Sequence, residues 1–151
     1  MAEISGILLA AGSARRFGRN KLLHPLHDGT PVAVQAAQRL VGALPNSIAV
    51  VRPDDADLAE ALAATGLDII ENPDAGEGMG TSLARGVRAT GEATGWMIAL
   101  ADMPWIESAT IDTLAMQLCR GASIIAPIHA GRRGHPVGFS GRWREALRDL
   151  S

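Results

Sequence analysis

Runs of apolar residues alternate with segments of helical spacing along the whole 151-residue chain. Residues 4–10 form a continuous apolar run, which is typical of a strand buried on both faces of a sheet. Shorter runs of this kind predict further strands at 47–51, 67–70, 96–101, 123–126 and 136–139. The pattern therefore indicates a sheet in which the first strand is buried on both faces.

Apolar residues recur at helical spacing between these strands. They predict helices at 32–44, 54–64, 81–90, 108–118 and 142–150. We expect Asp54 and Ser108 to cap the second and the fourth of these helices, because short polar side chains accept hydrogen bonds from exposed N–H groups there. Strands that alternate with helices imply right-handed crossovers and a mostly parallel sheet, so the predicted fold class is α/β.

Composition changes this picture little. The length suggests a single domain, 1–151, and 47% hydrophobic with 20% charged residues is ordinary for a globular protein. A net charge of −2 predicts no nucleic-acid partner, and no apolar run reaches the roughly 18 residues that cross a membrane. Cys119 has no partner for a disulfide, and we expect it to pack as a small apolar residue. A cytoplasmic location is the default expectation.

Lys21 is the only lysine among fourteen basic residues, and it closes a stretch that begins as the first apolar strand. Gly12 and Gly18 lie in this stretch among three arginines, a pattern that favours phosphate binding by turn N–H groups and nearby positive charge. The spacing is not that of a Walker A loop, because five residues instead of four separate the glycines. The alternative is that Lys21 is an incidental surface residue.

Two further loops follow predicted strands, where ligands of parallel sheets bind. Residues 72–83 hold three closely spaced glycines before the hydroxyls of Thr81 and Ser82, which suits close approach of a ligand but also a plain flexible connection. Asp102 comes directly after the fourth buried strand. Its carboxylate is a candidate ligand of Mg²⁺, and the alternative is a turn aspartate before Pro104.

A fourth loop, residues 131–138, carries two arginines followed by His135. The arginines could meet an anionic substrate and His135 could donate a hydrogen bond, whereas the simpler interpretation is an exposed basic hairpin. Asp54, Asp55 and Asp57 are interpreted as acidic residues in the first turn of a helix, where the helix dipole favours them.

Together these loops resemble the MobA-like nucleotidyltransferases and are most similar to the molybdenum cofactor cytidylyltransferase branch. The resemblance covers essentially the whole chain, in the family's order. It rests on Leu9-Ala10-Ala11-Gly12, Arg16-Phe17-Gly18, Lys21, Gly78-Met79-Gly80-Thr81-Ser82-Leu83, Ala101-Asp102-Met103-Pro104 and Gly134-His135-Pro136. It implies a three-layer Rossmann-like nucleotidyltransferase fold with a mostly parallel central sheet.

The resemblance also implies roles for individual residues. Arg16 and Lys21 would bind the triphosphate and, with Asp102 as the ligand of Mg²⁺, form the catalytic set. The acceptor would contact Gly134, His135 and Pro136. The nucleotide would be bound by Leu9, Ala10, Ala11, Gly12, Arg16, Lys21, Asn72, Gly78, Gly80 and Ser82.

The implied reaction transfers CMP from CTP to the phosphate of molybdopterin and releases pyrophosphate. Ala11 stands where the guanylyltransferase branch usually has glycine, which favours CTP over GTP. The alternatives are a guanylyltransferase, a sugar-phosphate nucleotidyltransferase, or a non-catalytic nucleotide-binding protein that serves a molybdoenzyme or its chaperone. Family members usually continue beyond the last helix into an Asp-rich segment, which is expected to be missing after Ser151 and leaves catalytic competence open.

Overall fold

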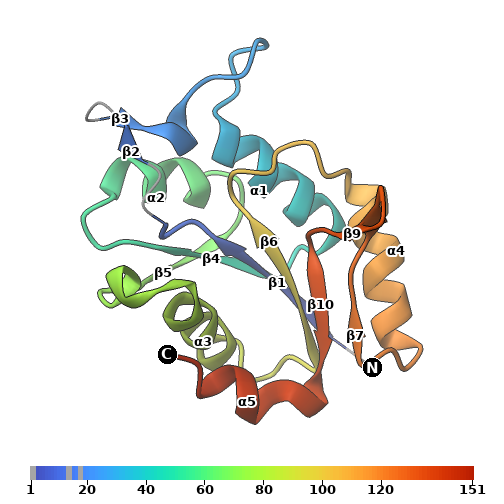
Figure 1. The fold of residues 1–151 in the computed structure, drawn as a ribbon. Helices are drawn as coiled ribbons and strands as arrows, with labels where there is room; N and C mark the ends of the chain where they lie inside the picture. Colours follow the sequence, from blue (N-terminus) through green and yellow to red (C-terminus); the bar gives the residue numbers. More distant parts are fainter. Residues whose placement is uncertain (1–2, 13–14, 17–18) are drawn as a thin grey trace.

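The computed structural model of the chain describes the backbone of residues 3–12, 15–16 and 19–151, and the side chains of residues 3–12 and 20–151. Six strands form one sheet in the order β5-β4-β1-β6-β10-β7. The strands are β1 Ile4–Leu9, β4 Ser47–Val51, β5 Asp68–Glu71, β6 Gly95–Leu100, β7 Ile124–Ile125 and β10 Val137–Ser140. β1, β4, β5 and β6 pair in parallel, and β10 runs antiparallel to both β6 and β7 (Figure 1).

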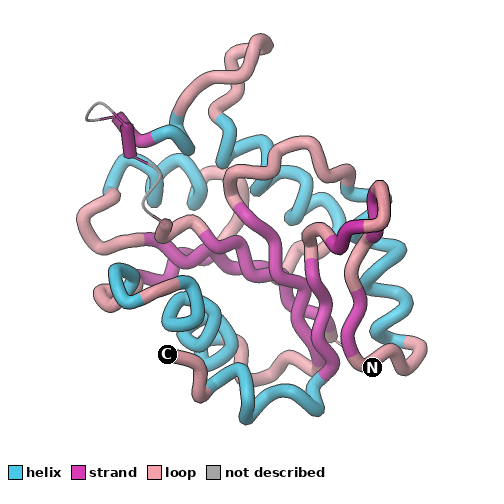
Figure 2. The backbone as a smooth tube through the Cα atoms, in the orientation of Figure 1, coloured by secondary structure: helices cyan, strands magenta, loops and turns pink. Residues whose placement is uncertain are grey.

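Helices cover both faces of this sheet, so the predicted three-layer α/β fold is confirmed. In Figure 2 the strands form one continuous layer between the helices. On one face lie α1 Val32–Ala43, α2 Ala56–Ala63 and α4 Ser108–Cys119. On the other face lie α3 Met79–Ala89 and α5 Arg144–Arg148, which contact each other. No helix of the described residues is long and apolar enough to cross a membrane.

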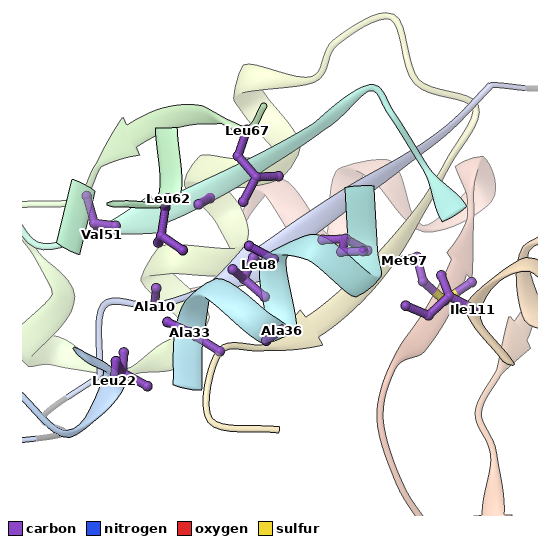
Figure 3. Packing of buried hydrophobic residues seen from close by; sticks show 14 of the residues in the cluster. Leu8, Ala10, Leu22, Ala33, Ala36, Val51, Leu62, Leu67, Met97 and Ile111 are labelled. Atoms are coloured by element: carbon purple, nitrogen blue, oxygen red, sulfur yellow. The ribbon is translucent and has the colours of Figure 1, made fainter. Parts of the chain in front are cut away.

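The central strand β1 is buried on both faces, as its continuous apolar run predicts. Leu8 belongs to the cluster under α1, and Figure 3 shows it among Ala33, Ala36 and other members of that cluster. Ile7 belongs to the opposite cluster, under α3. A Cβ at Gly86 of α3 would lie 2.8 Å from Ile7 Cγ2, so glycine there allows this helix to approach the strand closely.

Both predicted helix caps are wrong, because α2 begins one residue later than predicted and the Ser108 hydroxyl makes a tertiary contact. Asp55, not Asp54, is the N-cap residue of α2, and its carboxylate accepts hydrogen bonds from Asn20 instead of capping the helix. Ser108 is the first residue inside α4, and its hydroxyl donates to the carbonyl of Arg39 in α1 at 2.6 Å. The expected packing of Cys119 is also wrong, since this side chain is exposed at the helix end.

Two short hairpins complete the fold. β2 Arg15–Arg16 pairs with β3 Arg19–Asn20 and leads directly into the 3₁₀ turn η1, Lys21–Leu23. β8 Ile128–His129 pairs with β9 Arg132–Arg133, and all four of these residues are exposed. The simpler interpretation of residues 131–138, an exposed basic hairpin, therefore holds for its two arginines. The remaining 3₁₀ turns are η2 Ala75–Glu77 and η3 Gly141–Trp143.

Candidate functional site

A cavity of about 150 Å³ lies where β1 and β6 end and α3 begins. Among the described residues, its lining consists of Leu9, Ala10, Ala11, Gly12, Leu22, Ala75, Met79, Ser82, Leu100 and Asp102. Three of the four predicted loops thus contribute to one cavity at the carboxyl edge of the parallel strands, where such sheets bind ligands. Of these lining residues, Asp102 alone carries a charge.

The loop after β1 is fixed by the neighbouring strands up to the point where it reaches the cavity. The N–H of Ala10 donates to the carbonyl of Val50 at 2.9 Å, and Ala10 and Ala11 are buried. Gly12 is exposed, and a Cβ built on it would meet no atom within 4 Å. A ligand can therefore approach the backbone of Gly12 without displacing a side chain.

The second wall of the cavity is the N-terminus of α3. Gly78 is its N-cap residue with φ 128° and ψ 164°, a conformation that is essentially restricted to glycine. The first turn contains no acidic residue and no side chain caps it, so no carboxylate of this turn competes with an anion for the positive end of the helix dipole. Met79 is 60% exposed and lines the cavity, a contact that sequence reasoning missed because the helix was expected to start at Thr81.

Asn72 does not line the cavity but holds the first turn of α3 by hydrogen bonds. Its side chain is fully buried, and its Nδ2 donates to Ser82 Oγ at 2.8 Å and to Thr81 Oγ1 at 3.0 Å. Its Oδ1 accepts from the N–H of Asp74 at 3.0 Å. Because these bonds occupy the amide, Asn72 can act on a ligand only through the orientation of Ser82, which lines the cavity.

Gly78 and Gly80, also predicted to bind the nucleotide, are not among the lining residues. A Cβ at Gly80 would lie 2.9 Å from the carbonyl oxygen of Ser151, so this glycine allows the last residues to pack against α3. Gly78 contributes through the backbone conformation that sets the start of the helix. Both glycines thus shape the wall of the cavity.

His135 lies close enough to Asp102 for their charges to interact. Burial lowers the pKa of His135 below its ordinary value of 6.5, and the carboxylate of Asp102 acts in the opposite direction. His135 and Pro136 line a second, smaller cavity that shares Leu100 with the first. The predicted acceptor residues therefore lie beside the first cavity, except that Gly134 lines neither cavity.

Of the two predicted phosphate ligands, the structure describes the side chain of Lys21 and not that of Arg16. Lys21 is exposed and precedes Leu22, which lines the cavity, so its backbone lies at the cavity edge. The side chain of Arg16 lies outside the described residues. Within the described part of the chain, no three His, Cys, Asp or Glu side chains come together as a metal cluster, which leaves Asp102 as the carboxylate on the cavity.

The MobA-like NTP transferase domain matches residues 6–151, and the chain belongs to this family. Rv0371c from Mycobacterium tuberculosis H37Rv is a similar solved structure, with a TM-score of 0.84 and 26% identity over 99% of this chain and 77% of that chain. The structure of its complex with manganese has a TM-score of 0.79 and 27% identity, again over 99% of this chain and 77% of that chain. The nicotine blue oxidoreductase of Paenarthrobacter nicotinovorans is 29% identical over 95% of this chain and 74% of that protein.

Proposed function

We propose that this chain transfers CMP from CTP to the phosphate of molybdopterin, the organic part of the molybdenum cofactor. The observation that carries the proposal is the cavity lined together by Gly12 after β1, Ser82 near the start of α3 and Asp102 after β6. Family membership supports nucleotidyl transfer in general. The choice of CTP and of molybdopterin rests on the motifs of these loops, with Ala11 as the feature that favours cytosine.

The cavity suits a nucleotide because one side of it is apolar and the other borders groups that attract phosphate. Leu9, Ala10 and Leu100 offer apolar contact to a base, and the hydroxyl of Ser82 can donate a hydrogen bond. The phosphates would extend toward the N-terminus of α3 and toward Lys21, where the backbone dipole and the ammonium offset negative charge. Arg16 would add a second positive charge there.

Asp102 would hold Mg²⁺ in this proposal. A single exposed carboxylate fits this ion, because Mg²⁺ is commonly held by one or two carboxylates and completes its shell with water and substrate phosphates. When bound, the ion supplies charge neutralisation and polarises phosphate oxygens. The manganese in the Rv0371c complex is consistent with a divalent cation in a related protein.

The reaction requires little covalent help from the protein. An oxygen of the acceptor phosphate forms a bond to the α-phosphorus of CTP while the bond from that phosphorus to the bridging oxygen breaks, and pyrophosphate leaves with the electron pair. Lys21 and Arg16 would orient the triphosphate, and His135 with Pro136 would hold the acceptor on the opposite side. Alignment and fixed positive charge are the main sources of rate in such transfers.

Two measurements test the proposal. Calorimetric titration with Mg-CTP and Mg-GTP side by side should show tighter binding of CTP; binding of neither would refute the nucleotide site, and tighter GTP would favour guanylyl transfer. Release of pyrophosphate is then measured with molybdopterin and with a panel of sugar phosphates. Release of pyrophosphate with a sugar phosphate but not with molybdopterin would favour a sugar-phosphate nucleotidyltransferase. Binding without release would favour a non-catalytic protein of molybdoenzyme maturation.

A second candidate follows from the relative that is named an oxidoreductase. The same calorimetric series should therefore include NADH and NADPH. Binding of either dinucleotide in preference to both nucleoside triphosphates would favour oxidation–reduction over nucleotidyl transfer. We expect the triphosphates to bind more tightly, because the first loop lacks the glycine spacing of a dinucleotide fingerprint.

A further inference from the structure

Asn20 makes a set of side-chain hydrogen bonds immediately before Lys21. It ends β3 and is the N-cap residue of η1, where its Oδ1 accepts from the N–H of Leu22 at 3.0 Å. Its Nδ2 donates to Asp55, at 2.9 Å from Oδ1 and 2.8 Å from Oδ2. One amide thus fixes the turn that contains Lys21 and ties that turn to a residue 35 positions away.

Asp55 is suited to hold this turn in place. Its side chain is only 8% exposed, and it stands at the N-cap position of α2 without capping that helix. Burial of a carboxylate costs free energy unless the carboxylate is hydrogen-bonded. The hydrogen bonds from Asn20 therefore stabilise the folded state. Figure 1 shows the β2–β3 hairpin beside α2, which agrees with this contact.

We propose that Asn20 and Asp55 position Lys21 for the triphosphate. The inference rests on the proposed function, since it assumes that Lys21 binds phosphates. Lysine reaches its ligand through four flexible carbons, so its effectiveness depends on how firmly its backbone is held. The bond to Leu22 N–H fixes the turn, the bonds to Asp55 fix the turn against α2, and Leu22 packs into the cavity wall beside Lys21. Preorganisation of this kind lowers the entropic cost of binding.

Two single substitutions break the pair and one double substitution restores it. Asp55→Ala removes both acceptors, and Asn20→Asp sets two carboxylates against each other. Each should weaken binding of Mg-CTP about tenfold, because the loosened turn and the long Lys21 side chain must then be ordered when the triphosphate binds. In the double variant Asn20→Asp/Asp55→Asn, an amide at position 55 donates to a carboxylate at position 20, which still accepts from Leu22 N–H. Affinity should return to within about threefold of wild type.

Comparison of CTP with CMP separates positioning of Lys21 from general damage. CMP lacks the β- and γ-phosphates, so its affinity should change little in either single variant. In a Lys21→Ala background, Asp55→Ala should cause no further loss of CTP affinity, because the group that it positions is already absent. A merely structural role would weaken CMP and CTP alike and would persist in that background.

The chain contains a matched control. Asn46 Nδ2 donates to Glu3 Oε1 at 3.1 Å. This exposed asparagine–carboxylate pair lies where β1 and β4 begin, whereas the cavity lies where β1 ends. Asn46→Asp should leave the affinity for Mg-CTP and CMP unchanged. Thermal unfolding of each variant checks that it is folded. If a single variant does not fold, the affinity of the double variant Asn20→Asp/Asp55→Asn for Mg-CTP tests the proposal.

The outcomes distinguish the two proposals. If wild type binds neither Mg-CTP nor Mg-GTP, the proposed function is wrong and the positioning role falls with it. If wild type binds a triphosphate but Asp55→Ala and Asn20→Asp bind it equally well, only the positioning role is wrong. Equal losses for CMP and CTP, or a further loss in the Lys21→Ala background, would also overturn it.

Discussion

Replacement of Gly78 by alanine should destabilise the fold through backbone conformation alone. Gly78 has φ 128° and ψ 164°, and a Cβ built on it meets no atom within 4 Å. A steric clash with neighbours therefore contributes nothing, and the cost is that of placing an L-residue in a region reserved for glycine, about 1–3 kcal/mol. Hydrogen bonds on both sides of Gly78 prevent relaxation. Its N–H donates to Ala75, and its carbonyl accepts from the hydroxyl of Thr81 at 2.7 Å.

For a domain of this size, 1 kcal/mol corresponds to about 2–4 °C in Tm, so the Tm of Gly78→Ala should fall by roughly 2–12 °C. Gly91→Ala is the matched control, because Gly91 also has open space around its Cβ position but does not have a positive φ. We expect its Tm to equal or slightly exceed that of wild type. Thermal unfolding followed by circular dichroism measures both variants. Equal Tm values for Gly78→Ala and Gly91→Ala would refute the conformational argument.

Three further predictions concern the cavity. Lys21→Ala and Asp102→Ala should each lower kcat about 100-fold, as removal of preorganised charge commonly does, and near-normal pyrophosphate release by either variant would remove its assigned role. Gly12→Ala should leave Tm unchanged but weaken Mg-CTP binding in calorimetry, because its methyl group enters open space beside the cavity; unchanged affinity would argue against a ligand at this loop. The lowered pKa of His135 means that the unfolded chain binds a proton more readily, so stability present above pH 6.5 is lost as the pH falls below it. Urea unfolding at pH 7.5 and 5.5 should show a larger loss for wild type than for His135→Gln, and equal losses would contradict this assignment.

The order of strands and helices could be predicted because it depends on periodicity, which is local in sequence. The run at residues 4–10 is apolar at every position except Ser5 and Gly6, and only a strand with both faces covered needs that pattern. The place of β10 was harder to predict. Its residues predicted a strand, but their direction depends on β8 and β9, which turn the chain back beside β6. No apolar pattern marks those two exposed pairs of residues.

The positions of the cavity residues could be predicted in part, for a similar reason. Loops that follow parallel strands lie at one edge of the sheet, so Gly12 and Asp102 were expected at the same edge, and the pairing of β1 with β6 brings them to one cavity. Met79 was missed because its exposure depends on where α3 begins, and that point is set by the conformation of Gly78. Sequence spacing alone does not distinguish a glycine that starts a helix from one that contacts a ligand.

The absence of a side-chain cap at the starts of α2 and α4 has a common physical cause at Asp55 and Ser108. A short polar side chain near a helix start satisfies its hydrogen bonds either locally, by capping, or with a distant partner, and the sequence looks the same in both cases. In this fold the distant partners prevail. Asp55 accepts from Asn20, and Ser108 donates to Arg39, while buried Asn72 holds Ser82. The bonds of Asp55, which sequence rules place in the first turn of a helix, and of Asn72, which was predicted to bind the nucleotide, anchor segments that border the cavity. Both residues thus hold the segments on which the proposed chemistry depends.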